Sequence, residues 1–98
     1  MLLLIMIISF KDKEAERIWN EEFSRKYPHE IQRVALRKLI MLHKSINLLD
    51  LRIPPSNHLE KFKGNREGQY SIRINDQWRI CFTWDNGNTI DVEITDYH

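Results

Sequence analysis

The last three residues, Asp96-Tyr97-His98, are a carboxylate, a phenol and an imidazole in direct succession. They follow an alternation in which Ile90, Val92 and Ile94 are the apolar members, so they run out of a predicted strand. Histidine, tyrosine and carboxylate side chains transfer protons in catalysis. Because chain termini are often frayed, the tripeptide alone fits a solvated tail as well as a site.

The rest of the chain adds cations and further proton-handling groups. Six residues complete the set of candidate site residues: His58, Glu60, Lys63, Arg66, Arg73 and Arg79. Guanidinium groups bind phosphate and stabilise charge that develops in a transition state. The whole set suits cleavage of RNA by its own 2′-hydroxyl, which needs a base for the 2′-oxygen, cations around the phosphorus and an acid for the 5′-oxygen. That reaction requires no metal and no cofactor, and we expect none.

A metal site is the rival interpretation of the same residues. His58-x-Glu60 and Asp96-x-His98 contain the imidazoles and carboxylates that bind zinc, although their spacing is unspecific. Cys81 is the only cysteine, which excludes an intramolecular disulfide and a cysteine-based zinc cluster. We therefore favour acid–base chemistry and interpret Cys81 as a small strand residue.

Three alternating segments predict strands that position these groups. Their apolar members are Tyr70, Ile72 and Ile74, then Trp78, Ile80, Phe82 and Trp84, then Ile90, Val92 and Ile94. Opposed residues of an antiparallel pair share a face, so apolar residues must face apolar ones. This rule predicts the three-residue loop Asn75-Asp76-Gln77. It also places Trp84 opposite Ile90 and rejects a two-residue Asn86-Gly87 turn in favour of a longer loop.

The predicted register places Arg73 directly opposite Arg79 on the polar face. Facing like charges are unfavourable, unless a carboxylate such as Glu93 lies near them or an anion binds there. Tyr97 has the same parity and would lie diagonally from Arg79. The polar face is therefore a candidate anion site.

Two helices are predicted before the sheet. A strand at about residues 5–11 leads to a helix from Asp12 to Phe23, with Asp12 as its cap and Ile18, Trp19 and Phe23 on its apolar side. A second helix can begin at Pro28. Its apolar stripe has helical spacing: Ile31, Ala35, Leu39, Leu42, Ile46 and Leu49. Its basic face, with Arg33, Arg37 and Lys44, is either solvated or meets an acidic partner.

The length and bulk composition indicate one domain over residues 1–98. A net charge of +1 does not demand a nucleic-acid partner, so any anion-binding surface must be a local patch. The apolar start MLLLIMII lacks a basic region before it and is too short to span a bilayer. We expect no membrane association and a cytoplasmic location, and we interpret residues 1–5 as an extension upstream of Met6.

Three motifs together resemble the HigB (plasmid maintenance killer) branch of the RelE/ParE toxin superfamily. They are residues 63–72 (KGNREGQYSI), 75–82 (NDQWRICF) and the closing DYH at 96–98, with ISFK at 8–11 also fitting. The resemblance spans residues 6–98. It implies a compact α+β fold with an N-terminal strand, two helices and a three- to four-stranded antiparallel sheet.

The resemblance also implies a function. Members of this branch look like toxins of type II toxin–antitoxin pairs that cut messenger RNA on the ribosome without a metal. A helix-turn-helix antitoxin (HigA-like) neutralises the toxin and represses their operon, so operator DNA is bound only through the antitoxin.

Roles carried over from the resemblance fall on Asp96, Tyr97, His98 and Arg79, with Lys63 and Arg66 as phosphate contacts. Some members have a catalytic histidine three residues before the lysine of the Lys-Gly pair. This chain has Glu60 there and His58 two positions earlier. The base is then Glu60, or His58, or one of the C-terminal residues.

A non-catalytic binding module, or a gyrase-inhibiting toxin of the same superfamily, is the alternative function. It fits the same fold but leaves the Asp-Tyr-His ending unexplained.

Overall fold

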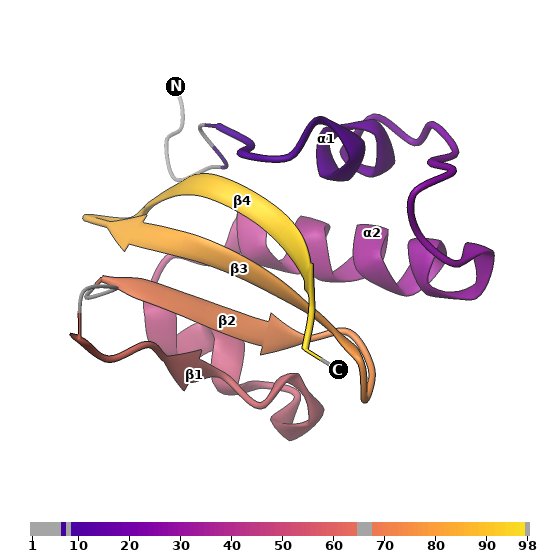
Figure 1. The fold of residues 1–98 in the computed structure, drawn as a ribbon. Coiled ribbons are helices and arrows are strands. Elements are labelled where there is room, and N and C mark those ends of the chain that lie inside the picture. The colour runs from indigo at the N-terminus through magenta and orange to yellow at the C-terminus, as the bar shows by residue number, and fades with distance from the viewer. Residues whose placement is uncertain (1–6, 8, 65–67, 98) are drawn as a thin grey trace.

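Two layers, one of helices and one of strands, make up the protein (Figure 1). The computed structural model describes residues 7, 9–64 and 68–97. A four-stranded antiparallel sheet in the order β1-β2-β3-β4 lies in front of α2 in Figure 1, so the helices cover one face and the other is open. The predicted α+β class is confirmed. The elements are α1 (Lys13–Trp19), α2 (His29–Lys44), the 3-10 helices η1 (Leu48–Arg52) and η2 (Pro55–Asn57), β1 (Glu60–Lys61), β2 (Gln69–Arg73), β3 (Trp78–Asp85) and β4 (Asn88–Asp96).

α1 begins as predicted and ends earlier. The Asp12 carboxylate accepts a hydrogen bond from the Glu14 backbone N–H at 2.9 Å, which is an N-cap contact. The helix stops at Trp19, because Glu21 adopts a φ of 63° that no right-handed helix accommodates. Phe23, predicted on the apolar side of this helix, is therefore wrongly assigned: it lies in the loop after α1 with 58% of its surface exposed.

α2 begins directly after Pro28, as predicted. Four members of the predicted stripe are buried: Ile31, Ala35, Leu39 and Leu42. The helix ends at Lys44 because Ser45 has an extended backbone. Ile46 and Leu49 lie beyond that end and are 66% and 58% exposed, so the stripe was predicted too long.

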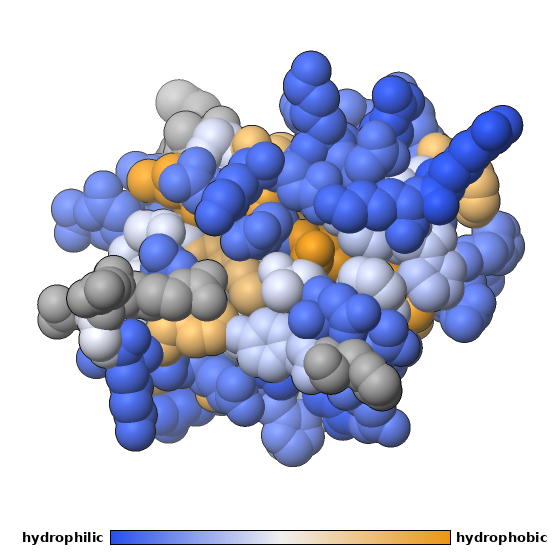
Figure 2. Space-filling model, in the orientation of Figure 1, coloured by the Kyte–Doolittle hydropathy of each residue, from blue (hydrophilic) through white to orange (hydrophobic). Residues whose placement is uncertain are grey.

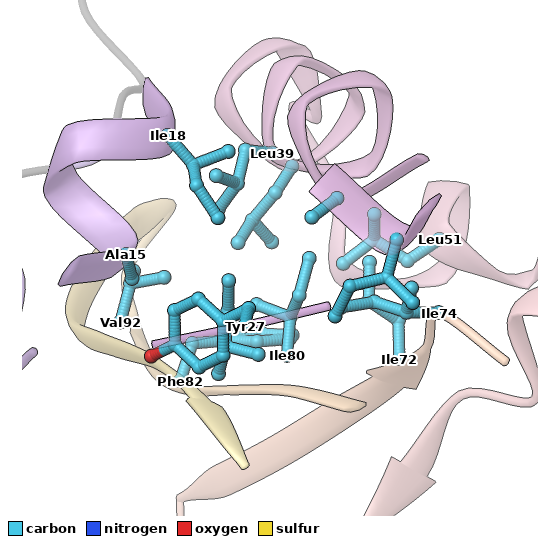
Figure 3. Packing of buried hydrophobic residues seen from close by; sticks show 14 residues of the cluster. Ala15, Ile18, Tyr27, Leu39, Leu51, Ile72, Ile74, Ile80, Phe82 and Val92 are labelled. Atoms are coloured by element: carbon cyan, nitrogen blue, oxygen red, sulfur yellow. The ribbon is translucent and has the colours of Figure 1, made fainter. Parts of the chain in front are cut away.

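The core lies between α1, α2 and the covered face of the sheet (Figure 3). α1 contributes Ala15 and Ile18, and η1 contributes Leu51. The strands contribute five buried apolar side chains, Ile72, Ile80, Phe82, Val92 and Ile94, and Ile74 directly follows β2. Each large apolar side chain buried in this way stabilises the fold by about 1.5–3 kcal/mol.

The β2–β3 hairpin has the predicted register. Arg73 is opposite Arg79, and the Ile74 N–H donates to the Trp78 carbonyl at 2.8 Å. The Asn75 side chain accepts hydrogen bonds from the backbone N–H groups of Gln77 and Trp78, at 2.9 and 2.8 Å. The three-residue loop at 75–77 is therefore confirmed.

The β3–β4 hairpin has the two-residue Asn86-Gly87 turn that the strand alternation was taken to exclude. Asp85 is opposite Asn88, so only Asn86 and Gly87 form the turn, with φ values of 51° and 89°. Positive φ at both central residues is the requirement of a type I′ turn. The rejection of a two-residue Asn-Gly turn was wrong.

A β-bulge in β4 explains how this turn is tolerated. Cys81 pairs with Glu93 but Thr83 pairs with Ile90, so β4 has one residue more than β3 between these pairs. Asp91 takes the bulge conformation, with a φ of 54°, and its N–H donates to the Ser9 hydroxyl at 2.9 Å. The extra residue reverses the alternation, so Ile90 falls on the open face instead of opposite Trp84.

The described residues before α1 run beside β4. The Lys11 N–H donates to the Val92 carbonyl at 2.9 Å, and the Val92 N–H donates to the Ser9 carbonyl at 3.1 Å. Ile7 and Phe10 form isolated parallel bridges to β4 rather than a continuous strand. The rest of the predicted strand, and the predicted extension at 1–5, lie outside the described residues. Within the described ranges, no helix is both long and apolar enough to cross a bilayer.

Candidate active site

Arg79 lies at the centre of the candidate site, on the open face of the sheet. Only 7% of its surface is exposed. Its Nε donates to the Ser71 hydroxyl at 2.8 Å, and its Nη2 donates to the Ser71 carbonyl at 3.3 Å and to the His58 carbonyl. Buried charges are tolerated when such polar contacts replace water. The guanidinium is therefore a fixed positive charge beneath the surface of this face.

Tyr97 covers Arg79 from the solvent side. The Arg79 Cζ lies 5.6 Å from the centroid of the Tyr97 ring, a cation–π distance. Phe62, which follows β1, stacks on the Tyr97 ring, with ring centroids 6.4 Å apart and planes 30° apart. Tyr97 keeps 41% of its surface exposed. Strand parity therefore placed Tyr97 on the correct face.

Gln77 holds the end of β4 in place. Its side-chain amide donates to Asp96 Oδ2 at 3.1 Å, and its carbonyl accepts the Tyr97 N–H at 2.6 Å. The β2–β3 loop and the segment that follows β4 are thereby tied together. The Asp96 carboxylate remains exposed at the surface.

The segment from η2 to β1 supplies the other edge of the site. His58 has a left-handed backbone, with a φ of 44°, which directs its carbonyl to Arg79 and leaves the residue exposed. Glu60 Oε1 lies 3.9 Å from Arg79 Nη2, and the Glu60 side chain is 56% exposed. Lys63 is exposed and lines a hollow beside Phe62. This segment thus brings the Glu60 carboxylate and the His58 carbonyl to Arg79, with Lys63 next to Phe62.

Arg73 is opposite Arg79 in register, but its side chain is engaged elsewhere. It forms an ion pair with Asp76 in the β2–β3 loop. Glu93, expected to offset the two arginines, instead lies 3.6 Å from Lys11. Asp76 and Glu60 are therefore the carboxylates that the structure places beside the opposed arginines.

Two predicted site residues, Arg66 and His98, lie outside the described residues. Over the described part of the chain, no three side chains of His, Cys, Asp or Glu gather into a group that could hold a metal ion. The rival metal site would need His98, so its full ligand set is not tested by the described geometry.

Three residues of this site were missed from the sequence: Ser71, Gln77 and Phe62. Ser71 and Gln77 have ordinary polar side chains, and only the three-dimensional path of the chain gives them their partners. Phe62 did have a signal, since it is an aromatic residue directly before Lys63 in an otherwise polar segment.

The arrangement combines fixed positive charge with exposed proton-handling groups. In the view of Figure 2, blue hydrophilic residues surround a central area in which white and orange, more hydrophobic residues are exposed. An aromatic ring that is partly exposed can stack on a base, while nearby cations attract the phosphate next to it. Exposed carboxylate and imidazole groups can exchange protons with a bound substrate. This face can therefore bind and cleave a single-stranded ribonucleotide segment.

Comparison with known proteins gives consistent matches. The family model described as "RelE-like toxin of type II toxin-antitoxin system HigB" matches residues 8–98. The chain is 40% identical over 83 residues to Toxin HigB-1 of Vibrio cholerae, a match that covers 84% of this chain and 87% of that protein. It is 32% identical over 95 residues to Endoribonuclease HigB of Proteus vulgaris, covering 95% of this chain and 100% of that protein. An uncharacterized protein of Haemophilus influenzae is 43% identical over 61 residues, which is 62% of this chain and 60% of that protein.

Proposed function

Because the chain belongs to the HigB-like family of RelE-like toxins of type II toxin–antitoxin systems, we propose that it is an endoribonuclease that cleaves messenger RNA on the ribosome. The name of the Proteus vulgaris relative supports the endoribonuclease activity. Translating ribosomes would present the substrate, and the toxin would act in the cytoplasm. The net charge of +1 is compatible with this role, because a substrate held by the ribosome needs no strong attraction from the toxin.

The contact between Arg79 and Tyr97 is the observation that carries the proposal. A buried guanidinium lies beneath an exposed aromatic ring, Glu60 and His58 contact the guanidinium, and Lys63 lies next to Phe62, which stacks on the ring. The ring provides a surface for one base, and the buried charge favours a phosphate next to it. Lys63 and Arg66 would contact that phosphate directly, because Arg79 itself is largely covered.

The cleavage step needs two proton transfers. A base removes the 2′-hydroxyl proton, the 2′-oxygen attacks the phosphorus, and the bond from phosphorus to the 5′-oxygen breaks. An acid then protonates the 5′-oxygen, which leaves a 2′,3′-cyclic phosphate and a 5′-hydroxyl. Glu60 and His58 are the candidate bases at the β1 edge, and we assign His98, oriented by Asp96, to the other proton transfer. Neither transfer requires a metal ion or cofactor.

A type II toxin has an antitoxin partner, and we propose that it is a helix-turn-helix protein of the HigA kind. That protein would repress the shared operon, so this chain would reach operator DNA only as part of the complex.

Cleavage in a translation extract tests the function. The wild-type chain should cut a reporter messenger RNA only while it is translated, with 2′,3′-cyclic phosphate and 5′-hydroxyl ends at the cuts. Removal of His98 should lower the rate by roughly 100-fold, the usual contribution of a positioned acid or base. Asp85→Ala, an exposed change at the far end of β3, is the matched control and should cut like the wild type. Unchanged cleavage without His98 would remove that assignment.

The choice of base is tested by Glu60→Gln and His58→Gln. Substitution of the true base should lower kcat and remove the acidic limb of the pH–rate profile, whereas the other substitution should change KM at most. Damage to DNA with no cut in messenger RNA would instead favour the gyrase-inhibiting alternative.

A further inference from the structure

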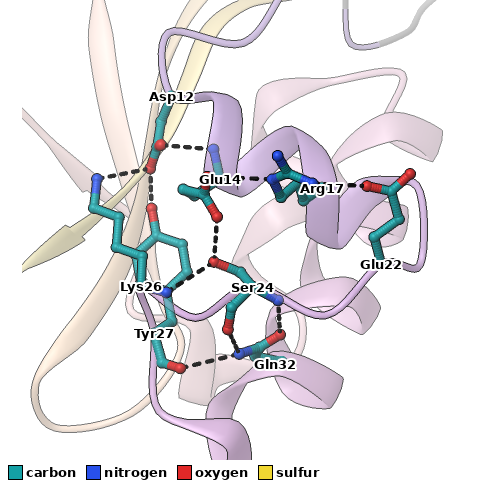
Figure 4. A network of polar contacts seen from close by, with 8 residues as sticks. All are labelled: Asp12, Glu14, Arg17, Glu22, Ser24, Lys26, Tyr27 and Gln32. Atoms are coloured by element: carbon teal, nitrogen blue, oxygen red, sulfur yellow. Dashed lines mark hydrogen bonds and ion pairs between the residues drawn. The ribbon is translucent and has the colours of Figure 1, made fainter.

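The loop between α1 and α2 is held rigidly by polar contacts (Figure 4). Ser24 is fully buried, and its hydroxyl donates to Glu14 Oε1 at 2.7 Å. Its N–H donates to Gln32 Oε1 at 3.0 Å, and the Gln32 amide donates back to the carbonyls of Ser24 and Tyr27 at 2.6 and 3.0 Å. Gln32 of α2 thus bonds the loop backbone directly, and Glu14 of α1 holds the Ser24 side chain.

This rigid loop holds a large aromatic side chain in solvent. Phe23 directly precedes Ser24 and is 58% exposed, with its ring 5.5 Å from that of His29. Leaving a phenylalanine exposed forgoes most of the 1.5–3 kcal/mol or so that its burial would contribute. Single exposed apolar residues are common on protein surfaces, so the exposure of Phe23 matters here only because polar contacts fix the loop that carries it. An aromatic residue fixed beforehand loses little entropy when a partner covers it.

Phe23 borders a groove with an apolar floor. The groove has a volume of about 300 Å³ and is lined by Ile18 of α1 and Leu36 of α2, with Phe23 at its rim. That volume is at the lower end of the range for ligand pockets, and it fits one or two apolar side chains. Aliphatic lining of this kind suits protein side chains better than the flat faces of nucleotide bases.

The charges around the groove favour an acidic partner. Arg33 lies on the rim, Arg37 follows one turn later on α2, and both are exposed. Among the described residues, neither arginine forms an ion pair or a side-chain hydrogen bond. Two acids also line the groove: Glu22 is 3.4 Å from Arg17, which offsets its charge, and Glu21 is exposed. With Glu22 offset by Arg17, Arg33 at the groove and Arg37 next to it on α2 outnumber the one remaining acid, Glu21.

We propose that this groove docks the antitoxin, through a segment with apolar side chains for the floor and carboxylates for Arg33 and Arg37. The proposal takes the existence of the antitoxin from the family, and it therefore rests on the proposed function for its partner. None of the groove residues belongs to the candidate active site. Docking can therefore be measured separately from cleavage.

Binding of the full-length chain to the antitoxin encoded beside it tests the proposal, with calorimetry as the measurement. Phe23→Ala should raise the Kd roughly 30-fold, as expected for an aromatic residue at the centre of an interface. Arg33→Glu should raise it at least about 10-fold by repelling the acidic segment. Thermal unfolding of both variants should match the wild type, because both side chains are exposed in the free protein.

Two matched control variants test whether the effect on binding is specific to the groove. Leu49→Ala changes an apolar residue of the same 58% exposure in η1, and Lys44→Glu reverses a charge at the far end of α2. Both should keep the wild-type Kd within about twofold. A wild-type Kd for Phe23→Ala, or weakened binding only in the controls, would overturn the proposal.

RNA cleavage separates the two proposals. Free Phe23→Ala should cleave messenger RNA at the wild-type rate. Lowered cleavage with unchanged antitoxin binding would show that the groove faces the ribosome, and it would overturn the antitoxin proposal. If the wild-type chain cuts no RNA, the proposed function fails, and the Kd values still decide where the antitoxin docks.

Discussion

The two faces of the sheet bury side chains in different ways. On the helix face, apolar residues such as Ile80 and Phe82 are at most 2% exposed and contact other apolar residues. On the open face, Arg79 is nearly as buried, at 7%, but its contacts are hydrogen bonds to Ser71 and to the His58 carbonyl. Apolar contacts are non-directional, whereas each buried polar group needs a partner in a set position. The helix face therefore accounts mainly for stability, and the open face for the positions of a few chemical groups.

The largest expected effect is a loss of stability from the helix face. Leu39→Ala should lower the free energy of unfolding by about 2–5 kcal/mol, because Leu39 is fully buried and the change leaves a cavity. Chemical denaturation measures the loss. Ile53→Ala, at a residue 74% exposed, is the control and should change it by less than about 0.5 kcal/mol. RNA cleavage by the folded fraction of Leu39→Ala should stay at the wild-type level, and a specific loss of cleavage would break the division between the faces.

Arg79→Met should lower RNA cleavage more than it lowers stability, the reverse of Leu39→Ala. It removes the partner of Ser71 and of the His58 carbonyl, so unfolding should become easier by about 1–3 kcal/mol. Cleavage at a temperature where the variant is folded should fall far more, by roughly 100-fold or greater. Arg79→Lys restores the charge without the fork of donors, and it should recover stability only in part. Full activity in Arg79→Met would show that Arg79 serves the fold alone.

Gly87→Ala tests the two-residue turn between β3 and β4. The residue has a φ of 89°, where an alanine is strained, so we expect a loss of about 1–2 kcal/mol in unfolding free energy. Thermal denaturation gives the value. Asn88→Ala alters the neighbouring residue without the strained φ and should cost less. An equal loss in both variants would argue against the type I′ turn.

The smallest effect should come from Lys38, a charge buried on the helix side. It is 4% exposed and donates to Asn57, and burial lowers its pKa below 10.5, with Arg37 and Arg73 lowering it further. The unfolded chain therefore holds this proton more tightly, so the free energy of unfolding should rise as pH approaches 10.5. Lys38→Met should lose that rise, while Lys44→Met, at an exposed residue of the same helix, should keep it. Identical pH slopes in the two variants would contradict the prediction.

Strand parity predicted the site better than it predicted the turns. It paired Arg73 with Arg79 and placed Tyr97 on their face, because no irregularity lies between those residues. It failed at the β3–β4 hairpin, because the bulge at Asp91 has no signature in residue type. The inward position of the Arg79 side chain was also beyond prediction, since it depends on the left-handed backbone of His58 after η2.

Helical periodicity failed for a related reason. Ile46 and Leu49 continue the spacing of the α2 stripe by coincidence, although the helix has already ended at Lys44. Phe23 likewise has the type of a core residue, but the left-handed backbone at Glu21 ends α1 before it. An apolar residue type indicates that a side chain is more stable when buried. The path of the backbone decides whether that side chain reaches the core.

The contact that Ile7 and residues 9–11 make with β4 bears on the order of folding. Ser9 and Asp91, which form its hydrogen bond at the bulge, are 82 positions apart in the chain. Closing a loop of that length costs more entropy than closing the short turns of the two hairpins. The hairpins should therefore form first and the early segment should dock last, onto a finished β4. Contacts made after the transition state slow unfolding without speeding folding. This segment should therefore lower the unfolding rate and lengthen the lifetime of the native state.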